Sequence, residues 1–256
     1  MTCEIVYGKN VTGDEFNELA APRDYCGRVR ERFPIIPKLD YPFDTSIAQK
    51  PVVFCYTKGQ KCKAILSCIK WFTGRPGNFF AQHLVFEMED DLVDAGPAWL
   101  VKRRGFYIDI AELDDWNARD KKITDDYDWQ PPIIQPSDYC IGTGTDWGIH
   151  INTEIIKHIS DTWNKEDGQK ANAQFILLFD PKEHRDGVRL DLLYNLYARL
   201  GKDRRWVYQF CTFDSQRGGK EPLKWDIVFV ANDDAKTQAY YKNKMYTSIN
   251  LKGEKP

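Results

Sequence analysis

The stretch that decides the fold runs from residue 171 to residue 201 and reads ANAQFILLFDPKEHRDGVRLDLLYNLYARLG. Its segment 173–179 is almost entirely apolar and is followed at once by Asp180-Pro181, which is typical of a buried strand that ends in a turn. Apolar residues then recur at helical spacing, which predicts a helix that starts at Asp186 and is closed by Gly201. One face of this helix is predicted to be apolar and carries Val188, Leu192, Leu193, Leu196, Tyr197 and Leu200.

The sequence on either side of this stretch extends the same pattern. Upstream, NTEIIKHISDTWNK at 152–165 has one apolar stripe at helical spacing and predicts an amphipathic helix. Downstream, RWVYQFCTF at 205–213 and KWDIVFVAN at 224–232 predict two strands. The C-terminal lobe therefore reads helix–strand–helix–strand–strand, and its strand–helix–strand part is expected to be a right-handed parallel crossover.

The N-terminal half has the pattern of an antiparallel sheet. Three β-rich runs, at 51–60, 61–71 and 78–88, are separated by breaks that contain Gly and predict a meander of antiparallel strands. Near the start, EIVYGK at 4–9 predicts a further strand, and DEFNELA at 14–20 predicts a short helix.

Together these elements predict an α+β (mixed α/β) protein. An antiparallel β-rich N-terminal part is expected to pack on a C-terminal strand–helix–strand–strand lobe. At 256 residues, a single domain spanning 1–256 and a division into two lobes are both compatible with the length. In the second case the lobes are 1–113 and 137–256, and the acidic, Pro-rich residues 114–136 form a connecting excursion.

Charge and cysteine content narrow the class of protein. Lys+Arg 36 and Asp+Glu 38 almost cancel, which disfavours a nucleic acid or a membrane as partner. The sequence contains no apolar run of the roughly 18–20 residues that a membrane helix needs, and its first residues lack the pattern of a signal peptide. The seven Cys form no CxxC pair. We therefore expect a cytoplasmic protein with reduced thiols.

The usual signatures of catalysis and of metal binding are absent from the sequence. The four His have no metal-ligand spacing, and GxSxG does not occur. His83 could pair in space with Cys68 or Cys140, but a buried thiol is favoured. We predict no catalytic residue, no metal and no cofactor. The question of enzymatic activity stays open, with a non-enzyme favoured.

Two places could bind an anion or a small molecule. The turn Gly74–Asn78 offers backbone N–H groups and the guanidinium of Arg75. Asp180 follows a strand of parallel type, where ligands gather in open α/β sheets. The candidate binding residues are Arg75, Asn78, His83 and Asp180. For both places an ordinary structural turn is the alternative.

Four segments resemble one family when they are read in order: TGRPGNFFAQHLVF at 73–86, DAGPAWLVKRRGFY at 94–107, and the residues 192–213 and 224–235. They are similar to the type-two N-terminal domain of bacterial GTPase-associated conflict-system proteins. The resemblance implies a regulatory or adaptor part of a bacterial immunity system in which an NTPase and an effector, often a protease, are encoded nearby. It brings no catalytic residues with it.

The leading hypothesis is therefore a non-enzymatic, protein-binding adaptor of an antiviral or conflict system. It would control an effector such as a protease, or be acted on by it, and one form of the hypothesis links it to a CRISPR-associated pathway. Its partners would be proteins encoded nearby. The alternative is a nucleotide- or small-molecule-responsive enzyme or sensor that uses the Gly74–Asn78 turn.

Overall fold

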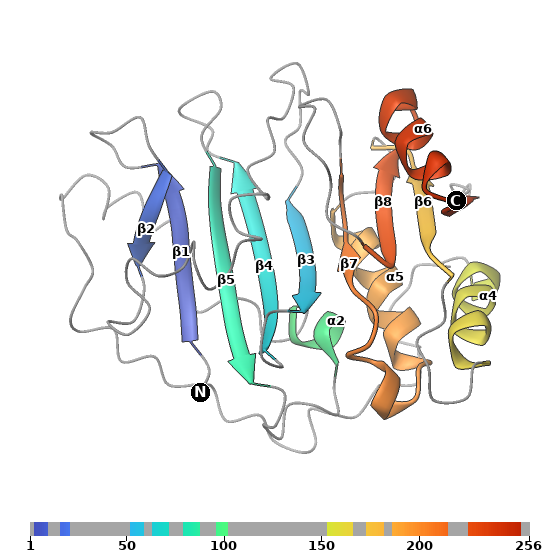
Figure 1. Cartoon of the computed structure of the whole chain (residues 1–256), viewed down its shortest axis with the longest axis horizontal. Coiled ribbons are helices and arrows are strands. Elements are labelled where there is room, and N and C mark those ends of the chain that lie inside the picture. Colours follow the sequence, from blue (N-terminus) through green and yellow to red (C-terminus); the bar gives the residue numbers. More distant parts are fainter. Residues whose placement is uncertain are drawn as a thin grey trace. The chain divides into compact units, whose positions relative to one another are not determined.

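The structure is a computed structural model, and it divides into two compact units (Figure 1). Unit 1 comprises Met1–Met88 and Gly105–Pro132, and unit 2 comprises Glu89–Arg104 and Ile133–Pro256. The residues that the structure describes are 3–9, 16–20, 52–58, 63–71, 79–87, 96–101, 153–165, 173–181, 186–214 and 225–251.

Unit 1 contains an antiparallel sheet with the strand order β2-β1-β5-β4-β3, and each neighbouring pair is antiparallel. The predicted meander is confirmed in β3, β4 and β5, and the predicted strand at 4–9 is confirmed in β1. The strands are β1 (Cys3–Lys9), β2 (Phe16–Ala20), β3 (Val53–Lys58), β4 (Lys63–Trp71) and β5 (Phe79–Glu87).

The helix predicted at 14–20 is wrong, because Phe16–Ala20 forms strand β2. This segment pairs with β1 through the register Tyr7↔Glu18 and Lys9↔Phe16. Pairing with a neighbouring strand satisfies the backbone groups of a short segment that has too few residues to hold an isolated helix. Tertiary context thus outweighed the local helical pattern.

The middle strands of unit 1 are covered on both faces. Every side chain of β4 from Ala64 to Ile69 is buried, although successive side chains of a strand point to opposite faces. The described side chains of β5, from Ala81 to Leu84, are also buried. The described polar side chains of these strands, Ser67, Gln82 and His83, therefore lie away from water.

Unit 2 contains a parallel sheet with the strand order β7-β8-β6-β9. The predicted helix–strand–helix–strand–strand order is confirmed, and a further helix and strand follow it. The predicted crossover joins β6 to β7, which are parallel, but β8 lies between them. The elements are α2 (Pro97–Trp99), α4 (Thr153–Asn164), β6 (Phe175–Phe179), α5 (Asp186–Ala198), η6 (Lys202–Arg204), β7 (Phe210–Cys211), β8 (Ile227–Ala231), α6 (Ala235–Asn243) and β9 (Thr247–Asn250).

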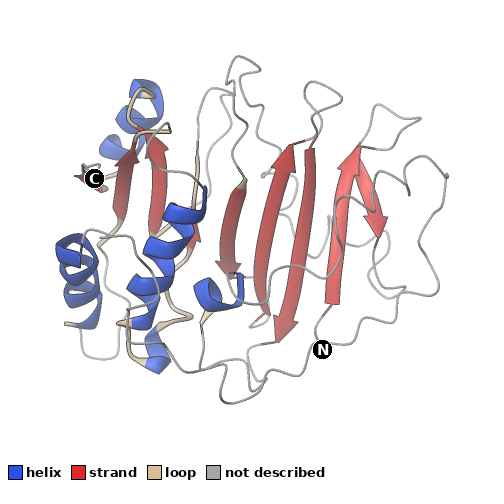
Figure 2. Ribbon diagram, turned by 180° about the vertical axis from the view of Figure 1, so that it is seen from behind, coloured by secondary structure: helices blue, strands red, loops and turns tan. Residues whose placement is uncertain are grey.

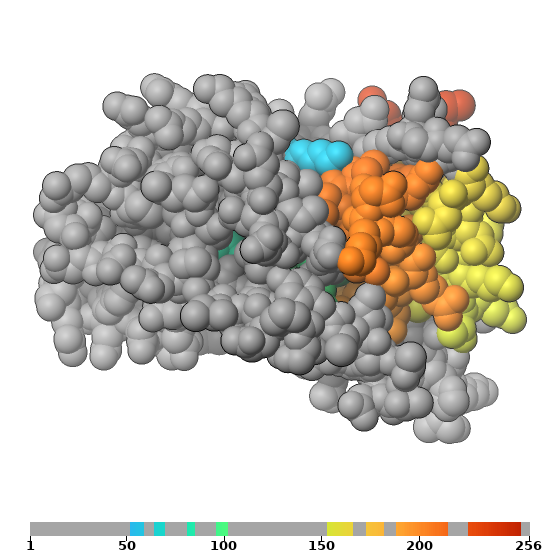
Figure 3. Space-filling model, turned by 90° about the horizontal axis from the view of Figure 1, so that it is seen from below, coloured from blue at the N-terminus to red at the C-terminus, as the bar shows by residue number. Residues whose placement is uncertain are grey.

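Helices lie on both faces of this parallel sheet. Figure 2 shows α4 and α5 in front of the strands and α6 behind them, and Figure 3 shows α4 beside the segment that contains α5. Trp163 of α4 anchors this helix layer, because it is fully buried and stacks on Tyr208 with ring centroids 4.0 Å apart. Its ring edge also meets Phe175 of β6 and Tyr197 of α5.

Helix α5 differs from the prediction in its burial and at its end. It is buried nearly all round, since Leu190 and Tyr194 are buried outside the predicted apolar face. Gly201 has φ −55° and does not adopt the left-handed conformation of a glycine that closes a helix. Instead Arg205 donates from Nε to the carbonyl of Leu200 at 3.2 Å, and this side chain satisfies the carbonyls at the end of the helix.

Helix α6 ends in a tight turn with Met245 at its centre. Tyr246 N–H donates to the Tyr241 carbonyl at 3.2 Å, and Met245 N–H donates to the Lys242 carbonyl at 3.0 Å, which is the bonding pattern of a Schellman motif. Met245 has φ 67°, and a non-glycine residue in this left-handed region costs about 1–2 kcal/mol. Met245 therefore occupies a position that suits glycine.

The α+β class predicted from the sequence is confirmed by the antiparallel sheet of unit 1 and the helices and parallel sheet of unit 2. The predicted connecting excursion at 114–136 lies outside the described residues, so the boundaries at 113 and 137 stay predictions. Among the described residues, no helix combines the length and the apolar character needed to cross a bilayer.

Candidate functional site

The four candidate residues from the sequence fall into three groups. Arg75 and Asn78, with the turn that holds them, lie outside the described residues. His83 lies in β5 of unit 1, and Asp180 directly follows β6 of unit 2. The two described candidates therefore belong to different units of the structure.

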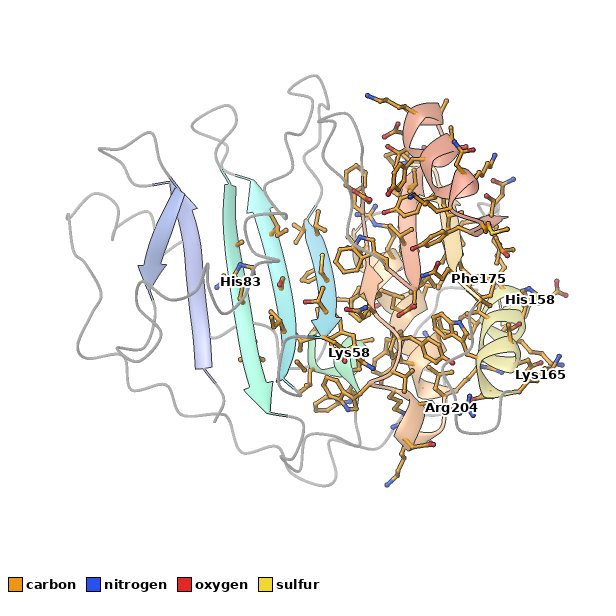
Figure 4. The ribbon with its side chains drawn as sticks, in the orientation of Figure 1. Lys58, His83, His158, Lys165, Phe175 and Arg204 are labelled. Atoms are coloured by element: carbon orange, nitrogen blue, oxygen red, sulfur yellow. The ribbon has the colours of Figure 1, made fainter. Side chains whose placement is uncertain are left out.

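His83 forms a buried polar pair with Ser67 in unit 1. Ser67 lies directly opposite His83 in the β4–β5 register, and Ser67 Oγ and His83 Nδ1 are 2.8 Å apart (Figure 4 labels His83). His83 is completely buried and Ser67 is 1% exposed. The hydrogen bond joins two adjacent strands through side chains on one face of the sheet.

Burial determines the charge state of this pair. Desolvation lowers the pKa of His83 from 6.5 to about 3, because a charged imidazolium without surrounding water is unfavourable. At neutral pH the ring is therefore uncharged, with one nitrogen protonated and the other an acceptor. A neutral imidazole bonded to a hydroxyl can in principle act as a base, but here both groups are sealed from solvent. In this state the pair stabilises the sheet and is closed to a substrate.

The sheet register decides which thiol shares a face with His83. Cys68 is opposite Gln82, so it lies on the other face of the sheet from Ser67 and His83. Cys55 is opposite Ser67 and lies on the same face as that pair. The buried thiol favoured from the sequence is therefore confirmed for Cys68, which is 1% exposed, and Cys140 lies outside the described residues.

Two buried polar atoms on this face have no hydrogen-bond partner among the described residues. They are Nε2 of His83 and Oγ1 of Thr57, which lies two residues from Cys55 and so on the same face. A buried polar group without a partner typically costs about 1–3 kcal/mol. This polar row is thus a costly feature inside an otherwise apolar sheet. Within the described part of the chain, no group of His, Cys, Asp or Glu side chains is arranged to hold a metal ion.

The second site is the carboxyl edge of the parallel sheet in unit 2, where Asp180 lies. After β6 the chain continues through α5 to β7, and after β8 it continues through α6 to β9. In the order β7-β8-β6-β9 these two connections run in opposite directions from adjacent strands, and their helices lie on opposite faces (Figure 2). The carboxyl ends of β6 and β8 therefore form a topological switch point, which is where open α/β sheets bind ligands.

The two strands stay paired up to this edge. Asn232 N–H donates to the Phe179 carbonyl at 2.8 Å, immediately before Asp180. Asp180 is half-buried, whereas Asn232 and Asp233 are exposed. Next to them, Asp234 accepts hydrogen bonds from the N–H and the hydroxyl of Thr237, at 3.1 and 2.8 Å, and so caps α6. The edge thus offers oxygen acceptors and a capped helix start.

Two buried acids lie near the ends of the parallel strands. Tyr241 of α6 donates its hydroxyl hydrogen bond to Asp214, and both side chains are buried. Asp226 is fully buried at the opposite end of β8 and accepts from the Gln209 N–H at 2.6 Å. Burial, with Asp226 as the next cause, raises the pKa of Tyr246, which therefore keeps its proton and donates to the Trp225 carbonyl at 2.5 Å. These contacts hold α6 and β9 to the sheet.

Comparison with known families bears on the first of these sites. Residues 24–118 match the family model described as GTPase-associated protein 1, N-terminal domain type 2. The resemblance predicted from 73–86 and 94–107 is confirmed, because both segments lie within the match. The matched range includes Arg75, Asn78 and His83. The segments 192–213 and 224–235 lie outside the matched residues. No curated protein and no solved structure matches the chain.

The sequence patterns named His83 and Asp180 as candidates but did not name Ser67. A signal was present, because Ser67 and His83 are polar residues within apolar runs and are equidistant from Arg75 in the sequence. A hairpin centred there pairs them, as the observed register does. The elements α6 and β9 were also missed, since only Thr237 and Tyr241 of α6 are buried and no apolar stripe marks the helix.

Proposed function

We propose that this protein is a non-enzymatic adaptor that binds a protein partner in a bacterial GTPase-associated system. The observation that carries this proposal is the match of residues 24–118 to the GTPase-associated family. A partner that is a GTPase, or that acts with one, follows most directly from the family's description.

The buried polar pair supports a binding role over a catalytic one. Among the described residues of the matched region, Ser67 and His83 form a pair of a hydroxyl and a potential base, and both are buried within the sheet. An uncharged, enclosed imidazole suits a rigid scaffold, because its hydrogen bond to Ser67 fixes two strands in register. A stable β-rich scaffold that presents surface loops is a common design for protein recognition.

The finer form of the proposal is a cytoplasmic component of an antiviral or conflict system. There it would regulate an effector such as a protease, or be cleaved by it, in a pathway that includes CRISPR-associated forms. A protein that must hold and release a partner needs a docking surface more than a reaction centre. This agrees with the absence of catalytic signatures from the sequence.

Co-expression tests the proposal directly. The tagged chain is produced together with each product of the genes that flank its own, any GTPase among them included, and the complexes are separated by size-exclusion chromatography with GDP or a non-hydrolysable GTP analogue present. We expect one neighbour to co-elute in fixed stoichiometry. A monodisperse chain that ignores every neighbour in both nucleotide states would contradict the proposal.

A second candidate function is a nucleotide- or small-molecule-responsive sensor or enzyme. The observation that favours it is the topological switch point between β6 and β8, with Asp180 at its edge. A ligand bound there at a hundred times its Kd raises the stability by about 3 kcal/mol, which a melting experiment detects.

The test is a thermal-shift panel of nucleotides on the wild type, Asp180→Ala and Arg75→Ala. Asp161→Ala serves as the matched control, because Asp161 is an exposed acid on α4, away from the carboxyl edge. A shift that Asp180→Ala abolishes and Asp161→Ala keeps supports a site at the edge, and loss in Arg75→Ala points to the Gly74–Asn78 turn. If no nucleotide moves the melting temperature of the wild type, the sensor function is rejected.

A further inference from the structure

Strand β9 is the outermost strand of the parallel sheet in unit 2. The N–H of Thr247 donates to the Gln174 carbonyl at 2.9 Å, and the N–H of Leu251, the residue after the strand, donates to the Leu178 carbonyl at 2.8 Å. Both bonds point toward β6. Because backbone groups alternate along a strand, the N–H and C=O groups of Ser248 and Asn250 point to the outer edge. Both residues are exposed, and within the described part of the chain neither has a hydrogen bond on that edge.

The turn before β9 exposes one large apolar side chain. Met245 is 90% exposed, and among the described residues it is the large hydrophobic side chain that stands out into solvent. Its backbone is in the left-handed conformation, with φ 67°, where glycine would fit without strain. A side chain that is kept in a strained position and packs on nothing suggests that it contacts something outside the chain.

The same region is positively charged. No acidic residue occurs between Ala235 and Leu251, whereas Lys236, Lys242 and Lys244 are exposed. Lys242 and Lys244 lie at the end of α6, close in sequence to the start of β9. The charge next to the open edge therefore complements an acidic partner, although the chain as a whole has a net charge of −2.

We propose that an extended acidic segment of a protein partner adds a strand beside β9. The β9 edge surface consists of Lys242, Lys244, Met245, Ser248 and Asn250. Backbone groups of Ser248 and Asn250 bind the main chain of the segment, Met245 contacts an apolar side chain, and the two lysines pair with its acids. β9 itself contains no charged residue and no proline, the two devices that commonly protect an open edge. This inference rests on the proposed protein-binding function.

Substitutions at the edge separate the contributions. Ser248→Pro removes an outward N–H but no hydrogen bond to β6, so the sheet tolerates it, whereas Ser248→Thr keeps the N–H and is the matched control. Met245→Gly removes the exposed side chain and relieves the backbone strain. Lys242→Glu with Lys244→Glu reverses the local charge.

The probe is a fluorescein-labelled peptide of about eight residues that alternates Glu and Val, the length needed to pair along a short strand. Fluorescence anisotropy should show saturable binding to the wild type and to Ser248→Thr. We expect Ser248→Pro, Met245→Gly and the double Lys variant each to weaken binding by about tenfold or more. A peptide that alternates Lys and Val should not bind. Amide hydrogen exchange should show that the peptide protects Ser248 and Asn250, while Ile249 is protected with or without it.

Three results would overturn the inference: no saturable binding of the acidic peptide, equal binding by Ser248→Pro and Ser248→Thr, or concentration-dependent dimerisation of the wild type that Ser248→Pro abolishes. The last result would assign the edge to a second copy of the chain. If a partner from a neighbouring gene co-purifies equally with the wild type and with Ser248→Pro, the adaptor function is supported, and binding at the β9 edge surface is rejected. If no product of a neighbouring gene co-purifies and the peptide still binds, peptide binding at the β9 edge surface is supported, and the GTPase-associated partner is rejected.

Discussion

Acidification should destabilise this protein through His83, and the sign follows from burial. In the folded state the pKa of His83 is about 3, and in the unfolded chain it returns to 6.5. As the pH falls below 6.5, the unfolded chain binds a proton that the folded protein does not, so the equilibrium moves toward unfolding. The contribution of neutral His83 to the free energy of unfolding is therefore complete above pH 6.5 and is lost progressively as the pH falls from 6.5 to about 3.

The two pKa values give the size of the effect. Relative to about pH 7.5, the free energy of unfolding should fall by about 1 kcal/mol at about pH 5.5 and by about 3 kcal/mol at about pH 4.5 from this residue alone. Surface carboxylates start to titrate near the lower value, so the interval from about pH 7.5 to 5.5 isolates the histidine best.

The assay is urea denaturation across this pH range for the wild type, His83→Gln and His158→Gln. His83→Gln removes the titrating group, so its stability should change less with pH than that of the wild type, whatever its stability at neutral pH. His158 is an exposed histidine on α4 (Figure 4), and His158→Gln is the control for removing a histidine from the chain. The comparison is between slopes against pH, which a uniform loss of stability does not affect.

Equal pH dependence in the wild type and His83→Gln would refute the reasoning. A second measurement covers the case in which His83→Gln does not fold. The NMR signals of the His83 ring in the wild type should not titrate between about pH 7.5 and 4.5, because its folded pKa lies below this range. A midpoint near 6.5 would show that the ring reaches water.

Three further predictions concern stability in urea at neutral pH. Ser67→Ala leaves His83 Nδ1 without its partner and should cost about 1–3 kcal/mol; an unchanged midpoint would show that the 2.8 Å bond contributes nothing. Trp163→Ala removes the ring that stacks on Tyr208 and should cost about 3–5 kcal/mol, with a smaller loss in Trp163→Phe. Asp234→Ala removes the cap of α6 and should lower the free energy of unfolding by about 1 kcal/mol. The control is Asp233→Ala, at the exposed neighbouring residue, which should change it by less than about 0.5 kcal/mol. Equal effects of the two substitutions would contradict the capping role.

The β9 edge surface adds a prediction in which stability and binding change in opposite directions. Met245→Gly should leave the melting temperature unchanged or raise it by roughly 2–4 °C. The left-handed backbone conformation is strained for methionine, and removing a side chain that is 90% exposed costs no packing within the protein. Peptide binding by the same variant should weaken. A lower melting temperature would show that Met245 packs on the protein.

The sequence by itself determined those elements whose apolar residues repeat with a clear period. β6 was readable as an apolar run that stops at Asp180, α5 as a helical pattern, and β3 to β5 as three strands between Gly-containing breaks. Most of the described residues that make these patterns become buried, since burial of apolar side chains is the main free-energy gain of folding.

Only the tertiary structure decided the features that depend on which segments of the chain are neighbours in space. Phe16–Ala20 became a strand because β1 offered its edge, and α5 ended at the guanidinium of Arg205 although Gly201 stood nearby. The partner of His83 was settled by a register that aligns Ser67 and turns Cys68 to the other face. The open edge of β9 likewise follows from the strand order. A local sequence pattern indicates which side chains of a segment are buried. Register and strand order decide which neighbouring segment covers them, and these depend on residues in distant parts of the chain.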